Sequence, residues 1–337
     1  MNHWYSIKGP LWREWRVNRR IILLFLVVLH FDILFNVLFQ QLFKAIALLF
    51  RYRYDMEPFD EWHQNVLNFY TGQGSNYSSF IVVAVIAAIG FGTFLISRDR
   101  LGVLPAYCAV PISRSQIFLS KYVTGIGAIL GGVALYYVVT VILGLLTGAD
   151  WSYTELTFRF ILIMCVLIGI FSLCILAATV TGHPLASSIV ATVLLLAPNY
   201  LSSWTKLMMG KSLSNLMDHL NLFYYLSDRF HLETGYSLFL ICGSILLMSL
   251  ITIYLSLNLF RHNQMEMNGE VFVLSSGMAM IRWIVSIFLA LQLTGMILHG
   301  SSSSWGLILF IDIILTLILW FLFPGVTTFI KIKMKKA

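Results

Sequence analysis

The sequence predicts an all-α integral membrane protein with about eight transmembrane helices. Hydrophobic residues make up 59% of the 337 residues, charged residues only 11%, and the mean hydropathy is +0.84. Soluble domains carry about 25% charged residues, so a soluble fold would have too little polar surface to cover this apolar content. The net charge of +7 is therefore interpreted against a membrane, and no nucleic-acid partner is expected.

Apolar runs of membrane-spanning length, about 20 residues, recur along the chain. They cover roughly 21–43, 80–97, 123–146, 158–180, 185–202, 236–259, 281–299 and 305–329. An even number of spans places both termini on one side of the membrane. Most of the 22 Lys and Arg residues then lie on that side, which the positive-inside rule makes cytoplasmic.

Residues 1–20 are predicted to form an amphipathic helix in the inner membrane interface. Proline near the first helical position favours a helix start at Gly9-Pro10. From there an apolar face and a basic face follow helical spacing, marked by Trp12, Arg13, Trp15 and Arg16. The same residues also suit a simple anchor at the lipid headgroups, and the two roles are compatible.

The first span carries a polar stripe. Asp32, Asn36 and Gln40 are spaced i, i+4 and i+8, so they share one helix face. A carboxylate inside the bilayer is costly and normally faces a cavity or a partner helix. The stripe is therefore predicted to line a translocation path or a dimer interface, or to form interhelical hydrogen bonds.

A polar, basic segment at 97–122 separates the second span from the third. Pro105 and Pro111 divide it into short pieces, because proline removes a backbone donor and disfavours helix in the preceding residue. After Pro111 we expect a turn and a new helix that continues into the third span. That span carries Gly127 and Gly131 at GxxxG spacing, which favours close helix packing.

The fourth and fifth spans are predicted to form a tight helical hairpin. Only residues 181–184, Thr-Gly-His-Pro, join them, and Pro198-Asn199 is expected to break the fifth apolar run. An amphipathic region of mixed charge follows at 199–235, and a polar linker at 261–271 precedes the last two spans.

The segment 97–122 resembles the first cytoplasmic loop of the ABC-2 family of ATP-binding-cassette transporter permeases. That family shows an Arg-acid-Arg start, a Gly-Thr-Leu-Glu-like step, a Pro-(Ile/Val)-Ser-Arg segment and a final Ser/Gly-Lys. The corresponding residues here are Arg98-Asp99-Arg100, Gly102-Val103-Leu104, Pro111-Ile112-Ser113-Arg114 and Ser120-Lys121. Pro105 stands where the family usually has Glu.

The resemblance implies an architecture. Residues 21–260 would form the six-span, type V exporter-like permease core, with 97–122 as coupling loop and 199–235 as an external re-entrant region. Residues 261–337 would add a linker, two extra spans and a basic cytoplasmic tail, as in eight-span members of antimicrobial-peptide-linked operons. Both termini would lie in the cytoplasm of a bacterial cell.

The resemblance also implies a function. The chain would be a non-catalytic subunit of an exporter for a peptide or amphiphile, and a separate cassette subunit would bind ATP and Mg and hydrolyse the ATP. The residues implied to couple to that subunit are Arg98, Asp99, Arg100, Gly102, Pro111, Ser113 and Arg114. The interface helix would touch the same subunit, and motion would pass into spans one, two and five. Membrane lipid and a second permease chain, identical or paralogous, complete the implied partners.

Two other function classes stay open. One is a stand-alone immunity or sensor protein that binds an antimicrobial peptide, and the other is a membrane-embedded lipid enzyme with Asp32 or Asp312 catalytic. The sequence has no complete GxxxxGK[ST], no HExxH and no GxSxG motif, and its four cysteines lack CxxC spacing. Neither an active site nor a metal site is therefore expected in this chain.

Overall fold

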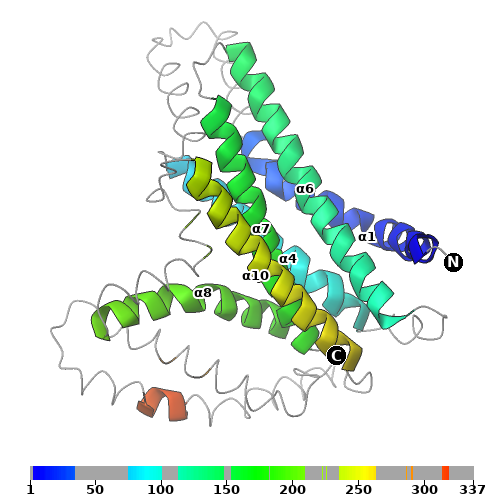
Figure 1. Cartoon of the computed structure of the whole chain (residues 1–337), viewed down its shortest axis with the longest axis vertical. Coiled ribbons are helices and arrows are strands. Elements are labelled where there is room, and N and C mark those ends of the chain that lie inside the picture. Colours follow the sequence, from blue (N-terminus) through cyan, green and yellow to red (C-terminus); the bar gives the residue numbers. More distant parts are fainter. Residues whose placement is uncertain are drawn as a thin grey trace, which may run out of the picture. The chain divides into compact units, whose positions relative to one another are not determined.

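The computed structural model describes residues 3–34, 75–100, 113–147, 153–181, 183–208, 235–262 and 313–318, together with 222, 225, 286 and 290. All of the long elements in this part of the chain are α-helices (Figure 1). They are α1 (His3–Leu34), α4 (Ser75–Arg100), α6 (Arg114–Thr147), α7 (Tyr153–Val180), α8 (Pro184–Met208) and α10 (Gly235–His262). The predicted all-α class is confirmed for these residues.

Three of the helices are long and apolar enough to cross a membrane. The qualifying stretches are Arg114–Ile142 in α6, Leu156–Val180 in α7 and Leu238–His262 in α10. Shorter apolar stretches lie in α4 and α8, at Ala84–Ile96 and Pro184–Pro198. Most of the last two predicted spans, 281–299 and 305–329, lies outside the described residues.

The chain divides into two compact units. The first unit holds residues 1–95, 116–172 and 222–253, and the second holds 96–115, 173–221 and 254–337. The boundaries cut through α4, α6, α7 and α10, and each unit is described separately.

An aromatic chain connects four helices of the first unit. Phe25 of α1 stacks on Phe91 of α4, with ring centroids 4.9 Å apart, and Phe91 stacks on Phe171 of α7 at 5.9 Å. Phe171 in turn lies 5.8 Å from Tyr122 of α6, whose hydroxyl is 3.0 Å from the Ser172 hydroxyl. Such ring pairs add to the free energy gained by burying the apolar surface itself.

The three stretches long enough to span a membrane differ in the fraction of each that is buried. In α7, 72% of the most apolar 18-residue window is buried, against 28% in α10. The outward side chains of α10 are large and apolar, including Phe239 at 78% and Leu250 at 64% exposure. The exposed apolar side chains of α10 are of the kind that a helix in contact with lipid carries.

Helix packing in the first unit depends on a glycine outside the GxxxG pair. A Cβ on Gly125 would overlap the ring of Phe171, so α6 can approach α7 only with glycine there. Gly127 and Gly131 are exposed instead, and a Cβ on either would meet no atom of the described chain within 4 Å. The described helices therefore do not pack on this pair, which lies on a different face of α6 from Gly125, and the expectation that it packs a helix stays a prediction.

The α7–α8 connection in the second unit is as short as the sequence predicts. Helix α7 ends at Val180 and α8 begins at Pro184. The amide of Ser187 donates to the His183 carbonyl at 3.0 Å, and the hydroxyls of Thr181 and Ser187 lie 2.6 Å apart. The amide of Leu185, one of the donors that a helix start leaves without a helical partner, donates to Nδ1 of His183 at 3.3 Å.

The predicted helix break at Pro198 is wrong. Helix α8 continues through Pro198 to Met208. Proline removes one amide donor, so the carbonyl of Leu194 loses its helical partner, but the rest of the helix keeps its bonds. Residues 199–208 of the predicted re-entrant region are therefore an extension of α8, and residues 209–221 lie outside the described residues.

Candidate functional site

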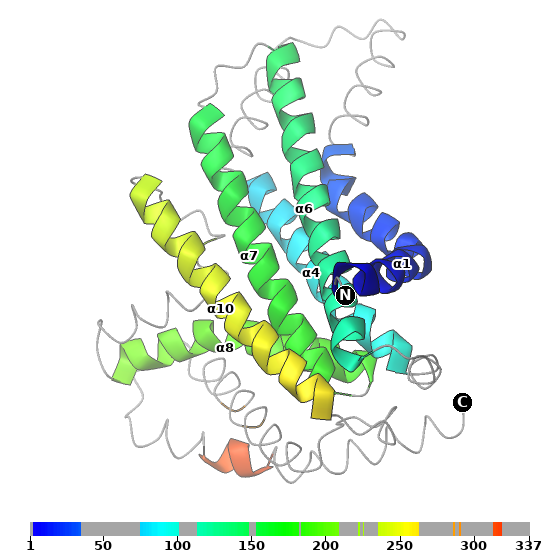
Figure 2. The same cartoon turned by 45° about the vertical axis from the view of Figure 1, so that its right-hand side comes forward.

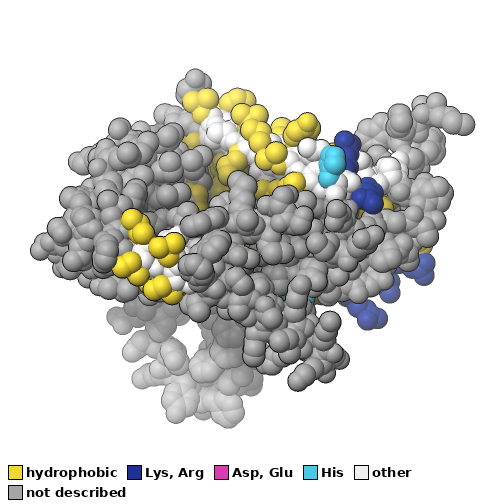
Figure 3. Space-filling view, turned by 90° about the horizontal axis from the view of Figure 1, so that it is seen from below, with side chains coloured by type: hydrophobic (Ala, Val, Ile, Leu, Met, Phe, Trp, Pro, Cys, Tyr) yellow, Lys and Arg dark blue, Asp and Glu magenta, His cyan; other side chains and the backbone are white. Residues whose placement is uncertain are grey.

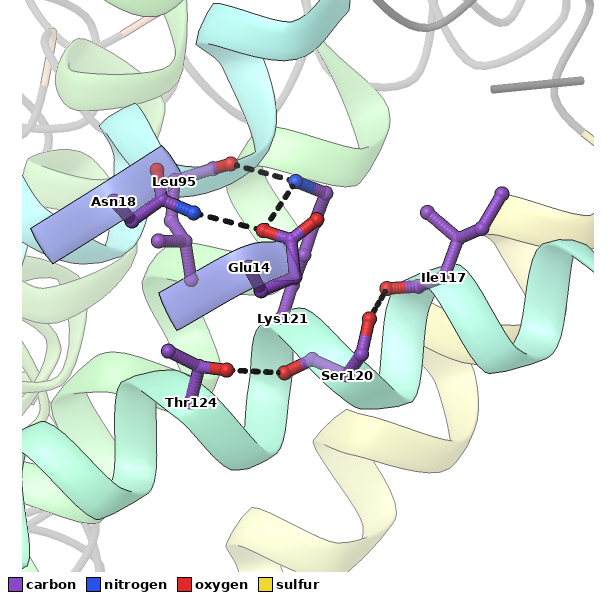
Figure 4. Close-up of polar contacts among 7 residues, drawn as sticks. All are labelled: Glu14, Asn18, Leu95, Ile117, Ser120, Lys121 and Thr124. Atoms are coloured by element: carbon purple, nitrogen blue, oxygen red, sulfur yellow. Dashed lines mark hydrogen bonds and ion pairs between the residues drawn. The ribbon is translucent and has the colours of Figure 1, made fainter. Parts of the chain in front are cut away.

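A buried ion pair connects the N-terminal helix to the start of α6. The ammonium of Lys121 lies 3.1 Å from Oε2 of Glu14, and the two side chains are 1% and 2% exposed (Figure 4). The same Oε2 accepts a 2.7 Å hydrogen bond from Nδ2 of Asn18. Lys121 Nζ also makes a longer, 3.5 Å contact with the Leu95 carbonyl. The site therefore joins α1, α4 and α6 within the first unit.

Helical spacing on α1 places the pair. Glu14, Asn18, Ile22 and Phe25 follow each other at intervals of three or four residues, and all four are buried. Trp12 and Trp15 point outward, at 62% and 54% exposure. The inward face of this stretch thus begins with polar residues, and its outward face is aromatic and basic.

The outward face of α1 has the character of a membrane-interface helix. The guanidinium of Arg16 lies 5.1 Å from the Trp12 ring centroid, a cation–π contact. Arg16, Arg19 and Arg20 are exposed, and so are Leu23 and Leu24 further along the helix. Figure 2 shows that the first part of α1 runs in a different direction from the part that follows.

Lys121 lies well inside α6. It follows the first residue, Arg114, by seven positions, which corresponds to about 10 Å along the helix axis. The hydroxyls of its neighbours Ser120 and Thr124 bond within α6, to the carbonyls of Ile117 and Ser120 at 2.9 and 2.8 Å. These hydroxyls therefore do not compete for the Glu14 carboxylate, which Lys121 and Asn18 approach.

The network carries a high desolvation cost. Removing a carboxylate and an ammonium from water costs several kcal/mol for each ion before their attraction is counted. Oδ1 of Asn18 is also buried, and it has no hydrogen-bond partner among the described residues. An apolar cluster of similar volume would pack there without these costs, so stability alone does not explain the choice of residues.

A second polar cluster lies where α6 begins and α10 ends, in the second unit. Arg114 donates through Nη1 to the Arg261 carbonyl at 3.1 Å, and Arg261 donates through Nε to the Ser115 hydroxyl at 2.8 Å. His262 adds a third basic group and is exposed. Figure 3 shows basic side chains and a histidine among the described residues of the face seen from below. The cluster gives this end of the two helices an exposed positive charge.

The predicted coupling residues are only partly within the described chain. Ser113 is exposed and immediately precedes α6, and Arg114 is its first residue, as expected of a helix that starts after Pro111. The backbone of Arg98, Asp99 and Arg100 forms the last turn of α4, but their side chains lie outside the description. Gly102 and Pro111 lie outside the described residues altogether.

The predicted interface and span residues divide in the same way. Trp12, Trp15 and Arg16 are exposed on α1, and Arg13 is half-buried. The backbone of Asp32 belongs to the last turns of α1, and its side chain is not among the described ones. Asn36, Gln40 and Asp312 lie outside the described residues, so the polar stripe stays a prediction.

Glu14 and Asn18 are the residues that sequence reasoning missed. Glu14 is the only acidic residue before Asp32, and it stands among arginines and tryptophans. An isolated acid with Asn four positions later was the available signal, because the two share one helix face. The pairing with Lys121 spans 107 positions and could not be read from spacing.

Metal sites and known relatives give no further assignment. The described residues contain no group of three His, Cys, Asp or Glu that could hold a metal ion. Comparisons with protein families, with curated proteins and with solved structures gave no match.

Proposed function

We propose that this chain is the transmembrane permease subunit of an ABC-2 type exporter, driven by ATP that a separate cassette subunit hydrolyses. The buried Glu14–Lys121 pair is the observation that carries the proposal. It joins the N-terminal interface helix to the 97–122 segment, the two regions whose sequence indicates contact with such a subunit. A permease subunit that is moved by its cassette partner needs such a direct connection between the two regions that the partner contacts.

The membrane arrangement is part of the proposal. The chain crosses a bacterial cell membrane eight times with both termini in the cytoplasm, and residues 21–260 form the six-span core. Three sufficiently long apolar helices and the exposed apolar side chains of α10 support membrane insertion. The exposed Trp12 and Trp15 support an interface position for the first part of α1.

The cassette subunit docks on Arg98, Arg100 and Arg114 and on the interface helix. The basic cluster of Arg114, Arg261 and His262 supports this, since its exposed positive charge suits an acidic partner surface. This chain is non-catalytic and binds no cofactor, while ATP and Mg belong to its partner. Two permease chains, identical or paralogous, form the pathway for a peptide or amphiphile.

Co-purification tests the proposal. The full chain is co-expressed with the cassette protein encoded nearest to it, and the complex is isolated from membranes. A variant with Arg98→Ala, Arg100→Ala and Arg114→Ala is expected to lose the complex or its ATPase coupling. Lys44→Ala, Arg51→Ala and Arg53→Ala remove equal charge from a predicted external segment and should leave the complex intact.

The other outcomes are equally informative. A complex that survives the cytoplasmic triple change keeps the permease function but moves the docking site, most simply to the interface helix. The lack of a complex with any cassette protein contradicts the proposal and favours a stand-alone immunity or sensor protein.

A further inference from the structure

We infer that Glu14 and Lys121 are positioning residues whose ion pair makes the first part of α1 and the start of α6 move as one body. The inference rests on the proposed function and deepens it. It adds α6, the third span, to the route of motion, whereas the sequence indicated spans one, two and five. It also assigns a role to Glu14 and Asn18, which belong to no motif, and to Lys121, which ends the motif of the 97–122 segment.

The burial of the pair is the first argument. Both side chains are almost completely shielded from water, at 1% and 2% exposure. A movement that separated α1 from α6 would break an ion pair between two side chains that are shielded from water, which is strongly unfavourable. The movement of lowest free energy therefore keeps Glu14 and Lys121 together and carries both helices with it.

The geometry of the pair is the second argument. Lys121 and Asn18 both donate to one oxygen, Oε2 of Glu14, at 3.1 and 2.7 Å. The Asn18 bond lies within α1 and orients the Glu14 carboxylate, and the directional, charge-assisted Lys121 bond then joins that carboxylate to α6. The adjacent contacts of α1, such as the stacked rings of Phe25 and Phe91, are apolar and non-directional. Among the described contacts between these two helices, the ion pair is thus the most directional.

Figure 4 shows why the third helix belongs to the same body. Lys121 lies between the Glu14 carboxylate and the Leu95 carbonyl, which is 3.5 Å from its ammonium. Leu95 belongs to the last part of α4, three residues before Arg98 in the same helix. A displacement at the end of α4 would therefore reach the ion pair directly, through the contact between the Leu95 carbonyl and the Lys121 ammonium.

A variant can separate positioning from packing. Replacing a buried ion pair with apolar residues of similar volume is often neutral or stabilising, so the apolar triple Glu14→Met, Asn18→Leu, Lys121→Met should fold. Met and Leu keep the volume but provide no directional bonds. Ser120→Ala is the matched control, because it removes a hydroxyl beside Lys121 whose described hydrogen bond stays within α6, to the Ile117 carbonyl.

The test uses the complex with the cassette subunit in liposomes. Leu145→Cys, 65% exposed near the far end of α6, reports movement through its rate of maleimide labelling in a chain with Cys108→Ser. The labelling rate is measured without nucleotide and with ATP and vanadate, and the ratio of the two rates is the readout. In the parent and in Ser120→Ala the ratio should differ from one. In the apolar triple it should fall to one, although the complex still assembles and hydrolyses ATP.

Each result has one reading. An apolar triple that keeps the parental ratio overturns the inference and leaves the permease function standing. The absence of any complex with the parent chain overturns the permease function and the inference with it. If the apolar triple does not assemble, the swapped pair Glu14→Lys, Lys121→Glu decides. A retained ratio supports the inference, and a ratio of one in an assembled complex overturns it.

Discussion

At the scale of single residues, the chain places its polar groups where an amphipathic pattern would put apolar ones. Glu14 and Asn18 are buried, whereas Trp12 and Trp15 are exposed. Burying polar side chains and exposing aromatic ones is stable when the exposed face contacts lipid headgroups and the buried carboxylate pairs with a cation. Lys121 provides that cation.

Removing one member of the pair should be far worse than removing both. Glu14→Ala leaves the Lys121 ammonium buried without its carboxylate, which is expected to cost about 3–5 kcal/mol of stability. The apolar triple at Glu14, Asn18 and Lys121 should differ from the parent by much less. Thermal unfolding of the purified protein in detergent measures both, with the exposed Arg20→Ala as control. Equal losses for Glu14→Ala and Arg20→Ala would contradict the buried pair.

Two glycines two positions apart in α6 provide a second residue-scale test. Gly125→Ala places a methyl group against the Phe171 ring and is expected to destabilise the fold by about 1–3 kcal/mol. Gly127→Ala enters open space and should be neutral or stabilising, by up to about 1 kcal/mol from helix propensity. Their unfolding temperatures should therefore shift in opposite directions or differ clearly. A larger loss at Gly127 would mean that a helix outside the described residues packs there.

At the scale of elements, local turn residues predicted some helix boundaries and missed others. The expected helix start at Gly9-Pro10 is wrong, because α1 begins at His3 and includes Pro10. A helix was correctly expected after Pro111, and residues 181–184 correctly indicated a tight connection, because proline and glycine act locally. Pro198 was misjudged, since a long apolar helix tolerates one missing bond. The partner of Lys121 was unpredictable, because it depends on how α1 folds back against α6 across 107 positions.

The two faces of α1 can be distinguished by cysteine labelling. Trp12→Cys lies on the outward face, where the native side chain is 62% exposed, and Asn18→Cys replaces a side chain that is 1% exposed. Maleimide should label position 12 about tenfold faster than position 18 in detergent, because exposure controls thiol access. Unfolding in denaturant should equalise the two rates and serves as the control. Similar rates in the folded protein would mean that α1 is not docked through Glu14.

At the scale of the whole molecule, the charge distribution sets the orientation in the membrane. The basic residues Arg16, Arg19 and Arg20 lie on the exposed surface of α1, and the sequence gives the C-terminal tail four lysines at 331–336. In the proposed orientation, anionic lipid of the inner leaflet would attract both of these basic segments. Composition was enough to predict a membrane protein. The predicted number of eight spans depends on further segments besides α6, α7 and α10, and most of the last two lies outside the described residues.

Orientation can be tested with an impermeant thiol reagent. Arg16→Cys and a cysteine added after Ala337 should both be labelled in inside-out vesicles and protected in intact cells. Gln64→Cys, in the predicted external segment, should show the opposite pattern. Labelling of the two termini from different sides would contradict an even number of spans.

The most direct measurement of the central claim is the ATPase activity of the neighbouring cassette protein, reconstituted in liposomes with and without this chain. The permease function predicts that hydrolysis increases several-fold when the chain is present, and that Arg98→Ala, Arg100→Ala, Arg114→Ala abolishes the increase while the external triple at Lys44, Arg51 and Arg53 does not. The increase is expected because the proposed docking on this chain would favour the conformation of the cassette protein that hydrolyses ATP. An unchanged hydrolysis rate, with both proteins present in the same liposomes, would contradict the account.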